Sequence, residues 1–346
     1  MAELINNLRE KAKEKPKRIV LPEGEEERII KAAGIISQKK IAIPLLLGNI
    51  EKIKEKAHYL KIDLRNIEII DPFNFPKISE YISFYCQMRK DHSISKKIAR
   101  IVLAKNLNLG ALMVRLGGGD GLVAGACNLT SSIIKSATLM LGLREGISLP
   151  SSFFIMALPD NSLGEEGVLI FADAAVNAEP DSSQLADIAI STAMSAKALL
   201  GWQPRVALLS FSTKRSASHP LVDKVIEANR IAHEKAPHLL IEGELQADAA
   251  LIPQIAKRKI KESKVAGRAN ILIFPDLNAA NISYKLVQYL AKARAYGPIL
   301  QGFARPINDL SRGATVEDIV SVIIITAVQA QENTSGRFLS VAGYPL

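Results

Sequence analysis

The sequence predicts an α/β protein with two domains. Short apolar segments alternate with helical patterns of about ten or more residues, which is typical of parallel sheets covered by helices. The chain has 346 residues, a length that suits two domains of ordinary size. Its hydrophobic content of 48% is enough to form sizeable cores, and glycine and proline are not in excess, which argues against disorder.

The first part of the chain is expected to alternate helices and strands. A helix over residues 1–15 ends at Pro16. Pro22–Arg28 opens a second helix, because its acidic residues suit the positive end of a helix dipole. A helical pattern also runs through Tyr85–Lys90. Short buried strands are expected at residues 18–22, 42–47 and 67–71.

A glycine-rich segment follows a further expected strand over residues 111–116. Within it, Gly119–Ala124 has the spacing of the dinucleotide-binding fingerprint G-x-G-x-x-A. That fingerprint needs a second strand ending in an acid about 20 residues later, but residues 133–143 look helical and Glu145 follows that helix. A dinucleotide site is therefore the weaker interpretation. The glycines either let backbone amides approach a phosphate or make a tight turn.

Hydroxyl side chains gather directly after the glycines. Thr130, Ser131 and Ser132 lie at the start of an expected helix, where hydroxyls and free backbone amides form a natural anion site. Simple N-capping of the helix explains the same residues about equally well.

The second part of the chain continues the α/β alternation. Ser212, Thr213 and Lys214 follow one of its expected strands, where they could reach a ligand in the crevice beyond the strand ends. Strands are expected at residues 168–173 and 206–210, and a helix over 182–200. Residues 151–156 are expected to start the second domain, and residues 249–253 and 271–274 supply further segments.

Residues 297–320 hold the densest group of chemically useful side chains. A Ser-Arg-Gly turn includes Arg312, whose planar guanidinium suits a phosphate or a carbonyl oxygen. Asp318 follows, just before a long apolar run. Thr315 and Asp318 also have the spacing of a helix capping box, and taken alone this favours a cap over a catalyst at Asp318.

Composition restricts the possible partners. A net charge of +9 fits nucleic acid, a membrane surface or a small polyanion. Aromatic content is only 5%, and no stacking platform or basic helix-turn-helix is visible. We therefore expect a small anionic substrate such as a phosphate ester, with no nucleic acid and no membrane as partner.

Cysteine, histidine and terminal patterns indicate the compartment. Cys86 and Cys127 are the only cysteines, which argues for a reducing compartment, and no His-Cys cluster suggests a metal. The N-terminus lacks the apolar region of a signal peptide. The longest apolar run is shorter than the ~20 residues that span a bilayer. We expect a soluble, cytoplasmic protein without a metal.

Five blocks, in order along the chain, closely resemble phosphate acetyltransferases (phosphotransacetylases), and the similarity extends from about residue 18 to about residue 330. The most specific block is residues 297–313, Gly-Pro-Ile-Leu-Gln-Gly-Phe-Ala-Arg-Pro-Ile-Asn-Asp-Leu-Ser-Arg-Gly. The others are Phe-Ala-Asp-Ala-Ala-Val-Asn at 171–177, Leu-Ser-Phe-Ser-Thr-Lys at 209–214, Gly-Glu-Leu-Gln-Ala-Asp-Ala-Ala at 243–250 and Ile-Phe-Pro-Asp-Leu-Asn-Ala-Ala-Asn at 273–281.

The resemblance implies a particular α/β architecture. Two α/β domains have a cleft between them, as in isocitrate and isopropylmalate dehydrogenases. The first domain is discontinuous, with residues 1–147 plus 300–346, and residues 148–299 form the second. The family is commonly homodimeric, so a homodimer is expected.

The resemblance also implies an activity: reversible acetyl transfer between acetyl phosphate and coenzyme A, by thiolate attack in a ternary complex and with no cofactor besides the coenzyme A substrate. Asp318 matches the family's proposed base and Arg312 the arginine that orients acetyl phosphate. Ser311 matches a serine that hydrogen-bonds the thiol or an oxyanion. The candidate substrate-binding residues are Arg89, Asn128, Thr130, Ser131, Lys135 and Tyr296.

The chain departs from the family pattern at several positions, including Met88 and Asp91 beside Arg89. The family usually has histidine where Asn128 stands, arginine where Lys135 stands and glycine where Arg215 stands. Many relatives carry cysteine where Ala174 stands, so a cysteine nucleophile is excluded there.

Two alternative functions remain open. Phosphate butyryltransferases share the fold and chemistry with a larger acyl pocket, although the 209–214 block and Leu-Gln-Gly at 300–302 look more like the acetyl enzymes. A non-catalytic acetyl-CoA-binding module, like the domains fused to some malic enzymes, is of a different class. Such a module need not retain a base or an arginine, whereas this chain keeps Ser311, Arg312 and Asp318.

Overall fold

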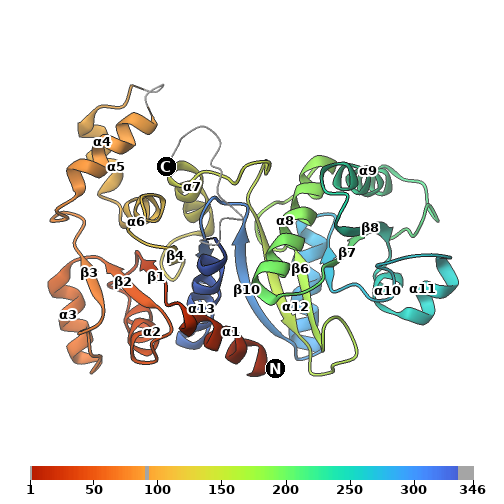
Figure 1. Ribbon diagram of the computed structural model, residues 1–346, viewed down its shortest axis with the longest axis horizontal. Coiled ribbons are helices and arrows are strands. Elements are labelled where there is room, and N and C mark those ends of the chain that lie inside the picture. The colour runs from red at the N-terminus through yellow and green to blue at the C-terminus, as the bar shows by residue number, and fades with distance from the viewer. Residues whose placement is uncertain (1, 90–92, 334–346) are drawn as a thin grey trace. The chain divides into compact units, whose positions relative to one another are not determined.

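The computed structural model describes residues 2–89 and 93–333 of the chain (Figure 1). Lys90, the last residue of one expected helical segment, lies outside the described residues. The fold divides into two compact units. The continuous unit comprises residues 145–302. The discontinuous unit comprises residues 2–144 and the chain from residue 303 onward, so the polypeptide leaves this unit and returns to it.

A five-stranded parallel sheet, in the order β11-β4-β1-β2-β3, forms the centre of the discontinuous unit. Strands covered on both faces read as continuous apolar runs, and the sequences of β1 and β2 are of this kind. The strands are β1 (Arg18–Leu21), β2 (Ile43–Leu47), β3 (Glu68–Ile70), β4 (Gly121–Ala124) and β11 (Ile307–Asp309).

Helices cover this sheet. The C-terminal helix α13 contains the apolar run that begins at Ile319, and it packs against the N-terminal helix α1, against α2 and against β4. The two ends of the described chain therefore meet in one unit, where Gln331 also donates hydrogen bonds to main-chain oxygens of α1. The helices are α1 (Ala2–Glu14), α2 (Glu27–Gln38), α3 (Ile50–Tyr59), α4 (Ile78–Met88), α5 (Lys96–Leu103), α6 (Asn106–Arg115), α7 (Thr130–Met140) and α13 (Val316–Asn333).

The prediction of a strand over residues 111–116 is wrong, because residues 111–115 belong to α6 and Leu116 is the C-cap of that helix. This helix is buried on nearly all sides, so its sequence lacks the alternation of apolar and polar residues that marks an amphipathic helix. Gly110 lies inside it because a Cβ there would come within 3.0–3.2 Å of side chains from three strands.

The glycine-rich fingerprint does not open a helix, which excludes the dinucleotide site. Gly121–Ala124 is the strand β4 itself. A Cβ on Gly119 would lie 2.5 Å from Val20 Cγ2, and one on Gly121 would lie 2.8 Å from Thr326 Cγ2. These two glycines therefore allow close packing within the core. Gly117, with φ of +78°, makes the tight turn before the strand.

A six-stranded mixed sheet forms the continuous unit, in the order β10-β5-β6-β9-β7-β8. The expectation of a parallel sheet holds for β6, β9, β7 and β8, but β5 pairs antiparallel with both β6 and β10. The strands are β5 (Ser151–Ala157), β6 (Val168–Ala172), β7 (Arg205–Leu209), β8 (Leu240–Leu245), β9 (Ile271–Ile273) and β10 (Arg294–Gln301).

Local sequence signals define the helices of this unit. Asp181 and Gln184 form a reciprocal capping box at the start of α8, and Gly201 ends that helix in a left-handed conformation. The helices are α8 (Ser182–Leu200), α9 (Pro220–Lys235), α10 (Ala247–Leu251), α11 (Pro253–Lys259) and α12 (Leu277–Leu290). Among the described residues, no helix combines the length and apolar character needed to cross a bilayer.

Candidate active site

Two neighbouring strands of the discontinuous unit end side by side and lead into candidate residues. β11 pairs with β4 so that Asp309 lies opposite Ala124, and both strands end at the same edge of the sheet. β4 continues into the loop of residues 125–129 and then into α7, which begins at Thr130. β11 continues into the Ser311–Ala314 turn and then into α13. In open α/β sheets, ligands bind beyond this carboxyl edge of the strands.

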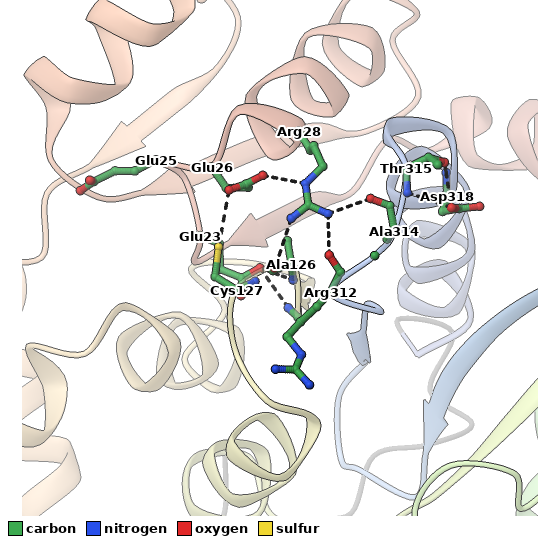
Figure 2. A network of polar contacts seen from close by, with 12 residues as sticks. Glu23, Glu25, Glu26, Arg28, Ala126, Cys127, Arg312, Ala314, Thr315 and Asp318 are labelled. Carbon is green, nitrogen blue, oxygen red and sulfur yellow. Dashed lines mark hydrogen bonds and ion pairs between the residues drawn. The ribbon is translucent and has the colours of Figure 1, made fainter. Parts of the chain in front are cut away.

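The Ser311–Ala314 turn exposes the side chains of Ser311 and Arg312. It is closed by a hydrogen bond from the Ala314 N–H to the Ser311 carbonyl oxygen at 2.9 Å. Figure 2 shows the Arg312 guanidinium extending away from both Arg28 and Asp318. Because an arginine presents a planar fork of N–H donors, the exposed guanidinium suits an external phosphate or carbonyl oxygen.

Asp318 lies in the first turn of α13 and caps that helix together with Thr315. Asp318 Oδ2 accepts hydrogen bonds from the Thr315 N–H and hydroxyl, and the Asp318 N–H points back to Thr315 Oγ1 at 3.2 Å. The capping box anticipated from the spacing is therefore present. All three bonds leave Asp318 Oδ1 unused, so the capping role and a role toward a ligand are compatible.

Arg28, at the start of α2, joins three segments of the chain through one side chain (Figure 2). Its Nη1 donates to the carbonyl oxygens of Arg312 and Ala314 at 2.8 and 2.9 Å. Its Nη2 donates to the carbonyl oxygen of Ala126 at 3.1 Å. Its Nε donates to Glu26 Oε1 at 2.6 Å, and this bond raises the pKa of Arg28.

The carboxylate of Glu23 fills a ring of backbone donors in the loop after β4. It accepts hydrogen bonds from the N–H groups of four consecutive residues, Gly125 to Asn128, and from Asn128 Nδ2, all at 2.8–3.0 Å. Converging backbone N–H groups of this kind form an anion-binding nest. The anion that this nest holds is the protein's own buried carboxylate, and the side chain of Asn128 is also fixed by it.

Thr130 and Asp309 connect the two strand ends directly. The Thr130 hydroxyl donates a hydrogen bond to Asp309 Oδ2. Asp309 is only 2% exposed, and burial raises its pKa to about 6. In the described part of the chain, its Oδ1 atom is buried without a hydrogen-bond partner. Asp309 is thus a buried carboxyl group directly behind the candidate residue Thr130.

The interpretation of Thr130, Ser131 and Ser132 as simple N-caps of α7 is wrong. The N-cap position is held by Leu129, and no side chain caps the helix. Leu129 has no side-chain acceptor and the Thr130 hydroxyl is turned to Asp309, so in the described structure the positive end of α7 has no capping side chain. Ser131 and Ser132 are exposed there, which is the arrangement expected of an anion site at a helix N-terminus.

A cavity of about 860 Å³ lies between the β1–α2 loop, α3, α6 and α7. Asn128, Ser132 and Lys135 line it. Lys56 and Lys105 also face it, so three lysines share the cavity with the acidic side chains of the β1–α2 loop. Two predicted substrate-binding residues, Asn128 and Lys135, thus line the same cavity. The proposed catalytic residues Ser311, Arg312 and Asp318 do not line it.

Two further candidate residues have surroundings of their own. Arg89 follows α4, and in the described residues its Nε is buried without a hydrogen-bond partner. Tyr296 lies on β10 of the continuous unit, where the Arg294 guanidinium is 6.0 Å from its ring centroid. Burial raises the pKa of Tyr296.

Sequence reasoning missed Glu23, Arg28 and Asp309. Glu23 and Arg28 enter the sequence analysis only as part of a helix start, although Glu23 lies just after the buried strand β1. Asp309 ends β11 within the most specific sequence block. A polar residue at the carboxyl end of an expected parallel strand is the signal that could have identified Glu23, whereas no strand is expected over residues 307–309 and Arg28 lies within α2. In the described part of the chain, no group of three or more His, Cys, Asp or Glu side chains is arranged to hold a metal ion.

Comparison with known proteins agrees with this architecture. The phosphate acetyltransferase of Thermoanaerobacterium thermosaccharolyticum is 50% identical over 328 residues, which are 95% of this chain and 99% of that protein. A phosphotransacetylase structure from Streptococcus pyogenes superimposes with a TM-score of 0.91 at 38% identity, covering 96% of this chain and 99% of that one. A 4-hydroxythreonine-4-phosphate dehydrogenase from Klebsiella pneumoniae, 11% identical, shares the fold with a TM-score of 0.54 over 91% of this chain and 100% of that one.

The fold class expected from the sequence, a dehydrogenase-like α/β architecture, is therefore confirmed. The model of the family described as Phosphate acetyl/butaryl transferase matches residues 3–327, nearly the whole chain. The chain belongs to the phosphate acetyl/butaryl transferase family.

Proposed function

We propose that this protein is a phosphate acetyltransferase, which transfers an acetyl group reversibly between acetyl phosphate and coenzyme A. The observation that carries the proposal is the edge of the parallel sheet where β4 and β11 end. The uncapped N-terminus of α7 and the exposed Arg312 guanidinium both follow this edge. Such an arrangement suits a substrate with phosphoryl and carbonyl oxygens. The names of the relatives support acetyl as the acyl group.

In the proposed reaction, Asp318 takes the proton of the coenzyme A thiol, and the thiolate attacks the carbonyl carbon of acetyl phosphate. The bond between that carbon and the bridging phosphate oxygen then breaks. Acetyl-CoA and inorganic phosphate are released, and the thiol proton ends on the phosphate. Asp318 Oδ1 is suited to the proton transfer because Oδ2 is occupied by Thr315.

Arg312 and Ser311 stabilise the negative charge that develops on the substrate oxygens during the attack. The guanidinium orients acetyl phosphate and stabilises the carbonyl and phosphate oxygens, and the serine hydroxyl hydrogen-bonds the thiol or the oxyanion. Substrate binding is assigned to Arg89, Asn128, Thr130, Ser131, Lys135 and Tyr296.

Both substrates are bound together in this mechanism. No side chain carries the acetyl group, and Ala174 stands where many relatives have cysteine. Holding the two reactants in contact can itself lower the barrier by ~7–11 kcal/mol. We expect initial-rate plots with lines that intersect, and no exchange of labelled phosphate into acetyl phosphate when coenzyme A is absent. Parallel lines with such exchange would indicate a covalent acetyl-enzyme.

The activity is tested by mixing the protein with coenzyme A and acetyl, propionyl or butyryl phosphate and following thioester formation. We expect the highest kcat/KM with acetyl phosphate. Faster turnover of butyryl phosphate would assign the butyryltransferase function. Tight binding of acetyl-CoA without turnover of any acyl phosphate would indicate a regulatory module. We also propose a homodimer, which sedimentation of the purified protein tests.

A further inference from the structure

One side chain, Arg28, connects the segments that carry most of the proposed catalytic machinery (Figure 2). Its hydrogen bonds reach Ala126, 98 residues away in the sequence, and Arg312 and Ala314, 284 and 286 residues away. The Ala126 segment leads to Asn128 and Thr130. The Arg312 to Ala314 segment carries the proposed arginine and leads directly into the Thr315–Asp318 capping box.

The contacts of Arg28 are made to main-chain oxygens, so they fix the path of the backbone rather than a particular side chain. Two of them hold the carbonyl groups on either side of Gly313. The turn that presents Arg312 is thereby held at two points. Within the turn, Ser311 accepts two further hydrogen bonds in the described structure. Its carbonyl oxygen accepts from the Ala314 N–H, and its hydroxyl oxygen accepts from the Gly313 N–H.

The other end of the connection is itself rigidly held. Glu23 fixes the N–H groups of residues 125–128 with four hydrogen bonds, including the one from Ala126, the residue whose carbonyl oxygen Arg28 binds. Glu26 fixes the Arg28 side chain through Nε. Glu23 thus binds the loop of residues 125–128 to the β1–α2 segment, and Arg28 binds the Arg312–Ala314 turn to the same segment.

We propose that Arg28 is a positioning residue for acetyl transfer: it sets the distance and orientation of Arg312 and Asp318 relative to the Asn128–Thr130 segment. The inference rests on the proposed function, since it assigns these residues to one reaction. A lysine cannot replace Arg28, because a single ammonium cannot span Glu26 and three separate carbonyl oxygens as the planar guanidinium does.

Kinetics of Arg28 variants test the proposal. Displacement of reacting groups by about 1 Å can cost about 100-fold in rate, so we expect Arg28→Ala to lower kcat by about tenfold or more. KM for acetyl phosphate should rise less than in Arg312→Gln, because Arg28→Ala displaces the Arg312 guanidinium without removing it. Arg28→Lys should recover little of the loss, and free guanidinium should restore part of the kcat of Arg28→Ala.

Arg115→Ala is the matched control in the same unit. Arg115 Nη1 also donates to two main-chain carbonyl oxygens, those of Met140 and Leu141 at 3.3 and 2.8 Å, but at the other end of α7. The Arg115→Ala variant should lower the free energy of unfolding by about as much as Arg28→Ala does, and its kcat should stay near that of the parent protein. If a folded Arg28→Ala protein kept its kcat, or lost no more than Arg115→Ala, the positioning role would be refuted.

Hydrogen–deuterium exchange separates this inference from the proposed function, because it needs no turnover. Arg28→Ala should speed exchange in residues 125–130 and 311–318 together, whereas Arg115→Ala should leave both segments protected. Unchanged exchange in the two segments would overturn the proposal, even in an active enzyme. If the parent protein fails to form acetyl-CoA, faster exchange in both segments would still establish the connection, and only the assigned reaction would fail.

Discussion

Asp318 Oδ2 accepts two hydrogen bonds from one residue, the N–H of Thr315 at 2.9 Å and its hydroxyl at 2.7 Å. This geometry fixes the carboxylate at the start of α13 with its second oxygen outside the capping box. The two roles considered for Asp318, helix cap and proton acceptor, therefore fall on different oxygen atoms. They can be separated by a substitution that keeps the cap and removes the base.

Asp318→Asn is that substitution. The amide oxygen can accept the same two bonds from Thr315, so the substitution loses only the modest attraction between the carboxylate charge and the helix dipole, and the melting temperature should change little. The amide cannot accept the thiol proton, so kcat should fall by at least ~100-fold, the lower end of what a general base contributes. Steady-state kinetics and thermal unfolding of one preparation measure both effects.

Asp181→Asn is the control at a second capping box, where Asp181 is the N-cap of α8 and Gln184 holds the position that Asp318 has in α13. It should leave kcat unchanged. A fully active Asp318→Asn enzyme would remove the base assignment and leave Asp318 as a cap only.

Arg312→Gln should lower kcat and raise KM for acetyl phosphate together. The exposed guanidinium is proposed to bind oxygens in both the ground state and the transition state, and glutamine loses the charge and the fork of donors. Varying each substrate in turn measures the two constants. If only KM for coenzyme A rose, Arg312 would belong to the site of the other substrate.

Asp309→Asn should change how stability depends on pH. Burial raises the pKa of Asp309 from 3.8 to about 6, so the folded chain binds this proton more tightly than the unfolded chain. The stability that Asp309 contributes is complete below about pH 4 and falls as pH rises through about 6. The difference of about two pKa units corresponds to roughly 3 kcal/mol at neutral pH.

Denaturant unfolding of both proteins from pH 4 to pH 8 checks this. The stability of Asp309→Asn relative to the parent should increase by up to about 3 kcal/mol across the range. The amide can still accept the bond from Thr130, while its buried NH₂ adds a cost that is the same at every pH. A stability difference that does not vary with pH would show that Asp309 has an ordinary pKa in the folded protein.

The sequence was sufficient to predict the parts of the fold that depend on neighbouring residues. The helix over 182–200 is α8, with the same bounds, because its cap and its terminal glycine are local signals. The sequence predicts a strand over residues 111–116, most of which lie in α6, because burial on nearly all sides removes the helical periodicity. The antiparallel pairing of β5 was also missed, since pairing direction depends on the path of residues far along the chain.

The same distinction applies to the candidate site. The Thr315–Asp318 capping box spans four positions, and its spacing predicted it. The contacts of Arg28, Glu23 and Asp309 join residues about a hundred or more positions apart. No periodicity or spacing rule encodes such contacts, so only the folded chain reveals that Thr130 is turned toward Asp309 and that Glu23 occupies the backbone nest.

Lys135→Arg tests a departure from the family pattern at the cavity that Lys135 shares with Asn128 and Ser132. A lysine keeps the positive charge that an arginine would bring but lacks its bidentate fork. One charge-assisted hydrogen bond is worth ~1.5–3 kcal/mol, so restoring a second should tighten binding by about tenfold. We expect a lower KM for acetyl phosphate or coenzyme A, with little change in folding stability.

Lys135→Ala should have the opposite effect and strongly weaken the binding of the same substrate, because it removes the positive charge from the cavity wall. Lys54, an exposed lysine on α3 that is paired with Glu51 and does not line the cavity, supplies the control. Lys54→Arg and Lys54→Ala should leave both KM values within about twofold, a difference of only ~0.4 kcal/mol. If the Lys135 variants behaved like the Lys54 variants, Lys135 would be a solvated helix residue whose stem lies on the surface, and the anion in the cavity would have to be bound without it.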